Sequence, residues 1–252
     1  MIKTAIFVEG QTELIFTREL ILKFFEYQNV RVECYNLFND KDLKPTEYSF
    51  PNEDANFYFQ ILNIGNDNKV ISSILKRERH LFSKDFDKII GLRDMYSKEY
   101  KDVVKNSTID LKTNKKFIES HQKTISDKSI DPEKIKFHFA IMELEAWLLG
   151  IENLFQRHNN KLNYAEIKKN CKIDLDKIDP ENEIFHPVNF VNKILEIVGD
   201  SYDKKKGEVN KFMGKIERQD FINLLESDKC ESFNHYCNSI GIQENANKKY
   251  LN

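Results

Sequence analysis

Four acidic side chains in this sequence lie at or just after the ends of apolar runs. They are Glu9, Asp94, Glu143 and Glu145. Such runs are typical of strands, and the parallel strands of an open α/β sheet bind ligands at their common carboxyl edge. Carboxylate oxygens suit Mg²⁺ or Mn²⁺, and without a cation the gathered acids would repel one another. The pattern predicts a Mg²⁺ or Mn²⁺ site, where two ions would stabilise the attacking and leaving oxygens of phosphodiester cleavage.

Each acid alone also has a simpler explanation. The chain contains 41 Asp and Glu residues, so a carboxylate at the end of a strand arises easily by chance and can merely face solvent. Recurrence at three predicted strand ends is what favours a site.

The first of these acids stands at a predicted strand-to-helix turn. Glu9 ends the apolar run at residues 5–8, Gly10 allows a sharp turn, and a helix is predicted over residues 12–28. Thr12 is the expected N-cap, and Glu13 lies where the positive end of the helix favours an acid. Glu13 is therefore a further candidate metal ligand.

Alternating strands and helices must position these acids. The predicted strands cover residues 30–38, 58–64, 88–92 and 134–142 in addition to 5–8. The predicted helices cover residues 12–28, 70–82 and 96–131, with another starting at residue 143, and residues 39–56 are expected to form a loop. This alternation predicts an α/β fold with a mostly parallel sheet flanked by helices.

The last hundred residues differ in character. Short helices are predicted over residues 187–198, 204–216 and 218–227. We expect residues 1–150 to form the metal-binding core and residues 151–252 a helical appendage packed on or beside it. No Gly/Ser or Pro linker marks a separately folding second domain.

Composition limits the other possibilities. The formal net charge is only −2, so a polyanion would have to be held by local basic patches. No apolar run reaches the roughly 20 residues that span a bilayer, and the first residues lack a signal-peptide pattern, so we expect a cytoplasmic protein without a membrane contact. The four cysteines show no C-x-x-C pairing. The phosphate-binding motif G-x-x-x-x-G-K-[ST] is absent, so the chain does not bind ATP through such a loop.

Several motifs, in order, resemble a known family. The motifs are Glu9-Gly10-Gln11-Thr12-Glu13, Asp94-Met95-Tyr96, Glu143-Leu144-Glu145-Ala146-Trp147-Leu148, His186-Pro187 and Tyr202-Asp203-Lys204. The first resembles the opening motif of TOPRIM domains, the metal-binding modules of topoisomerases, primases and nucleases of the overcoming-lysogenization-defect type. The ordered set resembles small bacterial TOPRIM-like proteins commonly encoded beside ATPases, over roughly residues 1–240.

This resemblance implies a TOPRIM-like fold and a divalent-metal-dependent nuclease that cleaves DNA or RNA. Glu9 would act as general acid/base or metal ligand and Asp94 as the central ligand. Glu143 and Glu145 would bind metal or position its water, and Lys204 would neutralise the scissile phosphate. The family context implies an antiviral defence effector working with an ATPase partner of the AAA or ABC type. Tyr96 replaces the second acid of the usual D-x-D motif, which allows a one-metal or degenerate site.

Two other functions stay open. A regulatory or docking subunit of an ATPase complex would keep the fold without catalysis, and a small-molecule phosphoesterase would use the same acids on another substrate. The basic run at residues 204–206 is also explained as a solvated helix face. The sequence leaves open the nucleic acid, its preferred sequence, the number of metals, the trigger and the oligomeric state.

Overall fold

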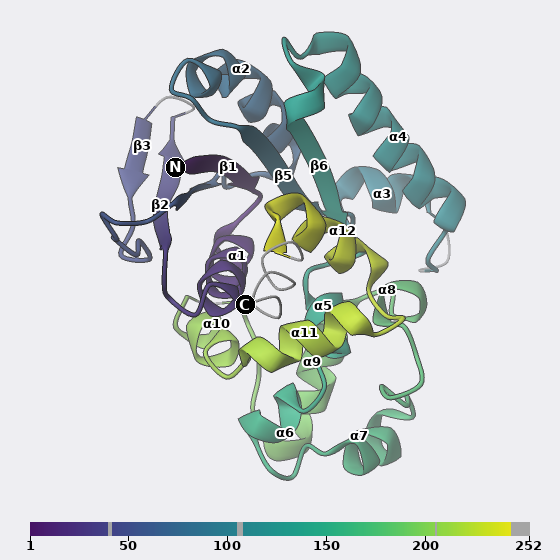
Figure 1. The fold of residues 1–252 in the computed structure, drawn as a ribbon. Coiled ribbons are helices and arrows are strands. Elements are labelled where there is room, and N and C mark those ends of the chain that lie inside the picture. Colours follow the sequence, from purple (N-terminus) through teal and green to yellow (C-terminus); the bar gives the residue numbers. More distant parts are fainter. Residues whose placement is uncertain (40–41, 105–107, 205, 243–252) are drawn as a thin grey trace. The chain divides into compact units, whose positions relative to one another are not determined.

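A six-stranded sheet forms the centre of the computed structural model, which describes residues 1–39, 42–104, 108–204 and 206–242 (Figure 1). The strand order is β3-β2-β4-β1-β5-β6. The strands are β1 (Ile2–Val8), β2 (Val30–Phe38), β3 (Asp42–Pro45), β4 (Phe57–Asn63), β5 (Lys88–Asp94) and β6 (Ile135–Ala140). β1 pairs in parallel with β4 and β5, and β2 pairs in parallel with β4. The predicted α/β class with a mostly parallel sheet and a C-terminal helical region is confirmed.

The central strand β1 is buried because its residues at positions 5–8 are all apolar and fully covered. Ala5 and Phe7 face a core that includes Ile74 of helix α2 (Val70–Phe82). Successive residues of a strand point to opposite faces, so Ile6 and Val8 face the other side. Figure 1 shows helix α1 (Gln11–Phe24) there, on the opposite side of β1 from α2.

The register of the central strands fixes where the first acids fall. Val8 of β1 pairs with Leu92 of β5 in a parallel ladder. The two strands therefore end at the same edge of the sheet. Glu9 directly follows β1, and Asp94 is the last residue of β5.

The described chain divides into two compact units. Unit 1 comprises residues 1–93, 115–139 and 235–252, and unit 2 comprises residues 94–114 and 140–234. The chain passes between the units four times, and none of these passages coincides with residue 150, where the predicted core ends. The division into a core and an appendage stays a prediction.

Unit 2 is largely helical. Its complete helices are α3 (Lys98–Val103), α5 (Glu145–Gly150), α6 (Leu154–His158), α7 (Tyr164–Cys171), α8 (Pro180–Glu183), α9 (Pro187–Leu195), α10 (Lys206–Met213) and α11 (Arg218–Glu226). The fully buried Trp147 of α5 donates from Nε1 to Glu181 Oε1 at 2.7 Å and lies against the Phe233 ring. Burial of this large side chain anchors α5, the helix that carries Glu145.

Helices α4 (Leu111–Lys128) and α12 (Glu231–Ile240) contain residues of both units. Within unit 1, the hydroxyl of Tyr236 in α12 hydrogen-bonds that of Thr17 in α1 at 2.8 Å, and both side chains are buried. None of the described helices is both long enough and apolar enough to cross a membrane.

Three local predictions are wrong. The segment predicted as one helix over residues 96–131 forms the two helices α3 and α4, because Asp110 accepts from the backbone of Lys112 and starts a new helix. Gly10, in extended conformation, is the N-cap of α1, so Thr12 lies inside its first turn. The predicted loop at 39–56 contains the edge strand β3, which is too short and polar to show an alternating pattern.

Candidate functional site

Three buried carboxylates of unit 2 form the acidic cluster, which we define as Asp94, Glu143 and Glu145. Their exposed fractions are 7%, 8% and 0%. Buried carboxylates are rare without partners because desolvation penalises the charged form. The partners of each acid therefore show what the cluster can do.

Asp94 is held by the backbone at the end of β6. The amide of Met95 donates to the carbonyl of Ala140 at 2.9 Å, and that of Tyr96 to the carbonyl of Met142 at 2.7 Å. Asp94 Oδ1 then accepts from the amide of Leu144 at 2.9 Å. Because Leu144 lies between the two glutamates, this contact brings all three acids into one region.

The turn that presents Glu143 has an uncommon backbone conformation. Met142 has φ of 64°, in the left-handed region, and its side chain is fully buried. A non-glycine residue adopts this region at a cost of order 1–3 kcal/mol, and such residues gather at functional sites. The sharp turn after β6 lets Glu143 and Glu145 follow the strand so closely.

Glu143 contacts the start of α9. Its Oε2 accepts from the amide of Val188 at 2.8 Å. Burial raises the pKa of Glu143, the negative charge of Glu145 raises it further, and the Val188 amide opposes both effects. A cation beside Glu143 would likewise lower its pKa.

Glu145 has the most complete set of partners. Its Oε1 accepts from the hydroxyl of Tyr202 at 3.1 Å, and Lys204 Nζ lies 3.0 Å from its Oε2. Oε2 makes no hydrogen bond, so Lys204 pairs with it through charge rather than through a directed donor. Asn192 of α9 fixes Tyr202 by donating to its carbonyl and accepting from its amide, at 2.8 and 2.7 Å.

An aromatic group connects two further motifs. The Tyr96 ring lies edge-on against His186, with centroids 4.7 Å apart, and its hydroxyl is 3.4 Å from His186 Nε2. Lys101 Nζ lies 4.3 Å from the centroid of the same ring. Burial lowers the pKa of His186, as does the charge of Lys101. Where the D-x-D pattern has a second acid, this chain has an aromatic contact to the His-Pro segment.

Unit 1 contains the other two predicted acids. Glu9 is partly exposed at the end of β1, whereas Glu13 is 4% exposed within the first turn of α1. A Cβ atom on Gly10 would lie 2.9 Å from Glu13 Oε2. Glycine thus allows the Glu13 carboxylate to lie directly over the turn that follows Glu9.

Comparison with known families places these residues in one domain. A family model described as "Domain of unknown function (DUF4276)" matches residues 8–240. The chain belongs to the DUF4276 family. The matched range includes the acidic cluster, Glu9, Glu13 and Lys204, so the candidate residues of this DUF4276 protein all lie in the shared domain. No curated protein and no solved structure matches the chain.

Within the DUF4276 domain, the predicted site residues fall into two groups. Asp94, Glu143, Glu145 and Lys204 come together in unit 2, and Glu9 and Glu13 lie in unit 1. Among the described residues, no three His, Cys, Asp or Glu side chains are arranged to hold a metal ion. Of the basic run, Lys205 lies outside the described residues, as does the side chain of Lys206.

The sequence of this DUF4276 chain did not predict the other contacts of the site. A backbone amide such as that of Val188 has no sequence signature. Asn192 lies among the apolar residues of α9, and nothing in that pattern indicated its role. Tyr202 and His186 were visible only as parts of short motifs. Arg18, a cationic residue of α1, pairs with Glu19 and donates to the carbonyl of Tyr48 at 2.8 Å.

Proposed function

We propose that this DUF4276 protein is a divalent-metal-dependent nuclease with a TOPRIM-like active site, acting in antiviral defence with an ATPase partner. The observation that carries the proposal is the acidic cluster: three carboxylates, each less than a tenth exposed, with one lysine in ion-pair contact. Hydrophobic burial does not explain three acids in one small region. Strained backbone, as at Met142, and an acid with a shifted pKa, as at Glu143, are typical of catalytic sites.

The donor chemistry fits a hard cation. Glu145 Oε2 is buried without a hydrogen bond, and all three acids offer the oxygen ligands that Mg²⁺ or Mn²⁺ prefers. Magnesium commonly uses one or two protein carboxylates and completes its shell with water and substrate phosphate, so a preformed cage of three ligands is not required. One or two of Asp94, Glu143 and Glu145 would hold the ion together with water and substrate, and the ion would stabilise negative charge at the scissile phosphate.

Side chains of the protein would have the remaining catalytic roles. Lys204 is one-third exposed and can turn from Glu145 toward a phosphate, where its charge would stabilise the transition state. Tyr202 would keep Glu145 in position through Oε1. From the TOPRIM resemblance, Glu9 at the end of β1 would act as general acid/base or metal ligand, with Glu13 as a further ligand.

A substrate panel tests the proposal. The purified protein is incubated with Mg²⁺ or Mn²⁺ and plasmid, single-stranded DNA, tRNA or a chromogenic phosphodiester, with and without the neighbouring ATPase. We expect cleavage of a polymer, abolished by chelator and by Glu9→Gln or Glu143→Gln. Glu133→Gln, outside all candidate groups, is the matched control. Cleavage that survives Glu9→Gln and Glu143→Gln, or of the small ester alone, would contradict the proposal.

One observation favours a second function, that of a docking or regulatory subunit. Each acid of the cluster already has a protein partner: the Leu144 amide, the Val188 amide, or Tyr202 and Lys204. Such contacts can hold the fold together without metal. Silence on every substrate, together with stable binding of the ATPase, would favour this alternative.

A further inference from the structure

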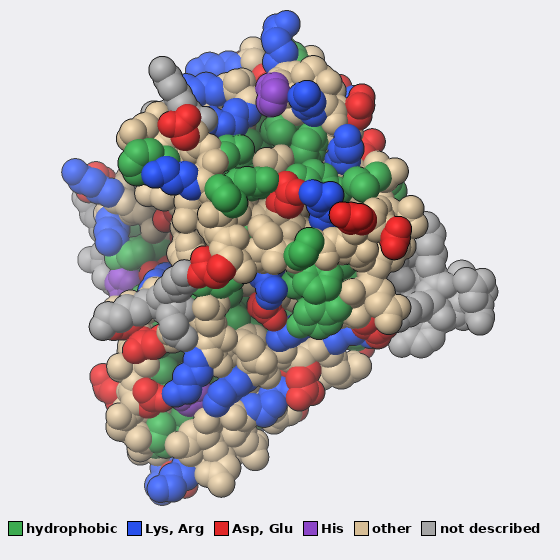
Figure 2. All heavy atoms as spheres, turned by 90° about the vertical axis from the view of Figure 1, so that its left-hand side faces the viewer, with side chains coloured by type: hydrophobic (Ala, Val, Ile, Leu, Met, Phe, Trp, Pro, Cys, Tyr) green, Lys and Arg blue, Asp and Glu red, His purple; other side chains and the backbone are tan. Residues whose placement is uncertain are grey.

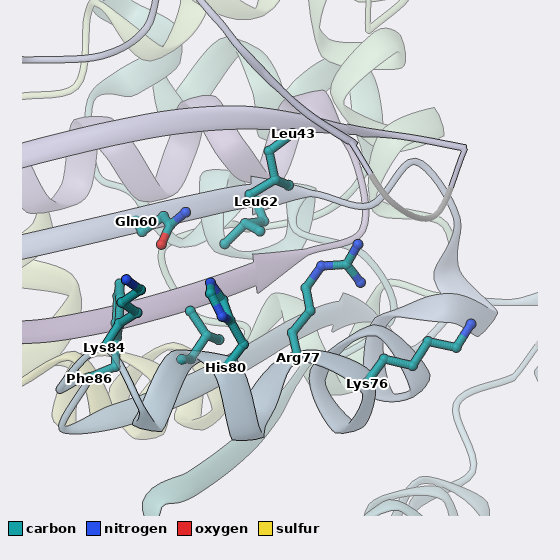
Figure 3. A pocket seen from close by; sticks show the side chains of 9 residues that line it. Leu43, Gln60, Leu62, Lys76, Arg77, His80, Lys84 and Phe86 are labelled. Carbon is teal, nitrogen blue, oxygen red and sulfur yellow. The ribbon is translucent and has the colours of Figure 1, made fainter.

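A second feature of unit 1 lies away from its acidic turn. A pocket of about 500 Å³ opens between helix α2 and the strands β3 and β4 (Figure 3). It is lined by Leu43, Gln60, Leu62, Lys76, Arg77, His80, Leu81, Lys84 and Phe86. All nine residues belong to unit 1. The volume is within the range of roughly 300–1,000 Å³ that is usual for small-molecule sites.

The floor of the pocket is apolar with one amide. Leu62, Leu81 and Phe86 are each at least nine-tenths buried, and Leu43 of the edge strand closes one side. Figure 3 shows Gln60 beside Leu62, across the pocket from His80 and Lys84. A flat apolar body with a hydrogen-bonding edge would match this floor.

The other side of the pocket is basic. Lys76, Arg77 and His80 project from α2, and Lys84 follows its end. The interval of four residues between Lys76, His80 and Lys84 places them along one flank of the helix. Figure 2 shows Lys and Arg side chains and a histidine gathered near hydrophobic side chains at the top of the face it displays.

None of the described residues that line the pocket is acidic. Glu78 of the same helix is buried and accepts from the Ser129 hydroxyl at 2.5 Å. Glu33 of β2 accepts from Tyr35 and Tyr58 and pairs with Arg31. In a chain with a formal net charge of −2, this local excess of basic groups calls for an anionic ligand.

We propose that this pocket binds a nucleoside phosphate, with the base on the apolar floor and Gln60 and the phosphate on the flank formed by Lys76, His80 and Lys84. The ligand is either a free nucleotide or a nucleotide within a single strand. The inference does not depend on the nuclease proposal, because it concerns binding by unit 1 alone and needs no metal. An inorganic anion would leave the apolar floor unused, and a neutral ligand would leave the basic flank unused.

Calorimetry on the full chain in the presence of chelator tests this inference. The probes are AMP, ATP, adenosine, inorganic phosphate and a single-stranded oligonucleotide of about ten nucleotides. We expect AMP or the oligonucleotide to bind at least about tenfold tighter than adenosine or phosphate alone, since each of those uses one half of the pocket. Binding of AMP identifies a free nucleotide, and binding of the oligonucleotide alone identifies a strand.

Paired variants locate the binding. Lys76→Gln with Lys84→Gln should weaken nucleotide binding at least about tenfold, and both side chains are exposed, so the fold should not change. Lys69→Gln with Arg79→Gln removes the same charge from exposed positions outside the pocket and should change affinity less than about twofold. Gln60→Leu should weaken AMP binding but not phosphate binding. No nucleotide binding at millimolar concentration, or equal loss in both double variants, would overturn the inference.

Discussion

Lys204 and Glu145 form an ion pair whose two members differ in burial. Glu145 is fully buried, and Lys204 is one-third exposed. Lys204→Met leaves a buried carboxylate without its cation, and we expect a loss of roughly 1–3 kcal/mol in the free energy of unfolding. Glu145→Gln should cost less, because the freed lysine can turn to solvent. Urea unfolding of both variants and of the double variant measures the difference between the two losses in free energy of unfolding.

The double variant supplies the control for this prediction. Lys204→Met with Glu145→Gln removes both charges and should recover part of the loss. A cost equal to the sum of the single variants would mean that the two side chains do not interact.

Glu181 makes stability depend on pH. Burial raises its pKa from 4.5 to about 7, although Ser232 and Trp147 donate to it. An acid with a raised pKa stabilises the fold below its unfolded value, and this contribution is lost as pH rises through the folded value. Between pH 4.5 and about 7, the wild type should therefore lose roughly 3 kcal/mol relative to Glu181→Gln.

Unfolding by urea at a series of pH values measures this difference. The control is Glu183→Gln, at an exposed position on the same helix. Its free energy of unfolding should change with pH as that of the wild type does. A wild type that gains stability relative to Glu181→Gln over this range would contradict the assignment.

Two glycines on the central strands and their turns are needed for different reasons. A Cβ on Gly91 of β5 would lie 2.5 Å from the Phe137 ring and 2.9 Å from Ile74, both packed in the core. Gly91→Ala should therefore cost about 1–3 kcal/mol through overpacking. At Gly10 the clash is with the flexible end of Glu13, so Gly10→Ala should cost less than about 1 kcal/mol.

The two variants separate stability from activity. If the nuclease proposal holds, Gly10→Ala should displace the Glu13 carboxylate and lower cleavage without lowering the melting temperature by much. Gly91→Ala should lower the melting temperature while the surviving folded protein keeps its activity per molecule. Thermal melts together with cleavage assays report both quantities. A Gly10→Ala variant that loses melting temperature but keeps its activity, and a Gly91→Ala variant that loses activity but keeps its melting temperature, would contradict these expectations.

At the scale of the whole molecule, the regular elements followed from the sequence more readily than the site. β2 and α2 have the predicted bounds, because alternation and a 3.6-residue period are local properties. The joining of Asp94 to Glu143 and Glu145 was predicted from strand ends. The contact of the Val188 amide with Glu143 was not, because it joins residues 45 positions apart through packing. The Asn192–Tyr202 pair was not, because it depends on the path of the chain after α9, which no periodic pattern specifies.

The proposed ATPase partner concerns the whole molecule. We expect the contact surface at residues 187–216. Most large apolar side chains there are buried: Phe190, Val191, Ile194, Leu195, Val209, Phe212, Met213 and Ile216. A contact through this segment would use its polar side chains and should weaken with added salt. We expect co-purification with the adjacent ATPase and little cleavage without it. Vigorous cleavage by the isolated chain, with no partner recovered, would contradict this expectation.

The hydrogen bond between Thr17 and Tyr236 has a consequence for synthesis. Its two residues are 219 positions apart, yet both are buried in unit 1. At about 5–20 residues per second, the ribosome makes the second roughly 10–40 s after the first. Throughout that interval the nascent helix α1 lacks the neighbour that satisfies its Thr17 hydroxyl, and its apolar surface is open to chaperones. Unit 1 starts first during translation and can be completed only after nearly all of unit 2 has been made.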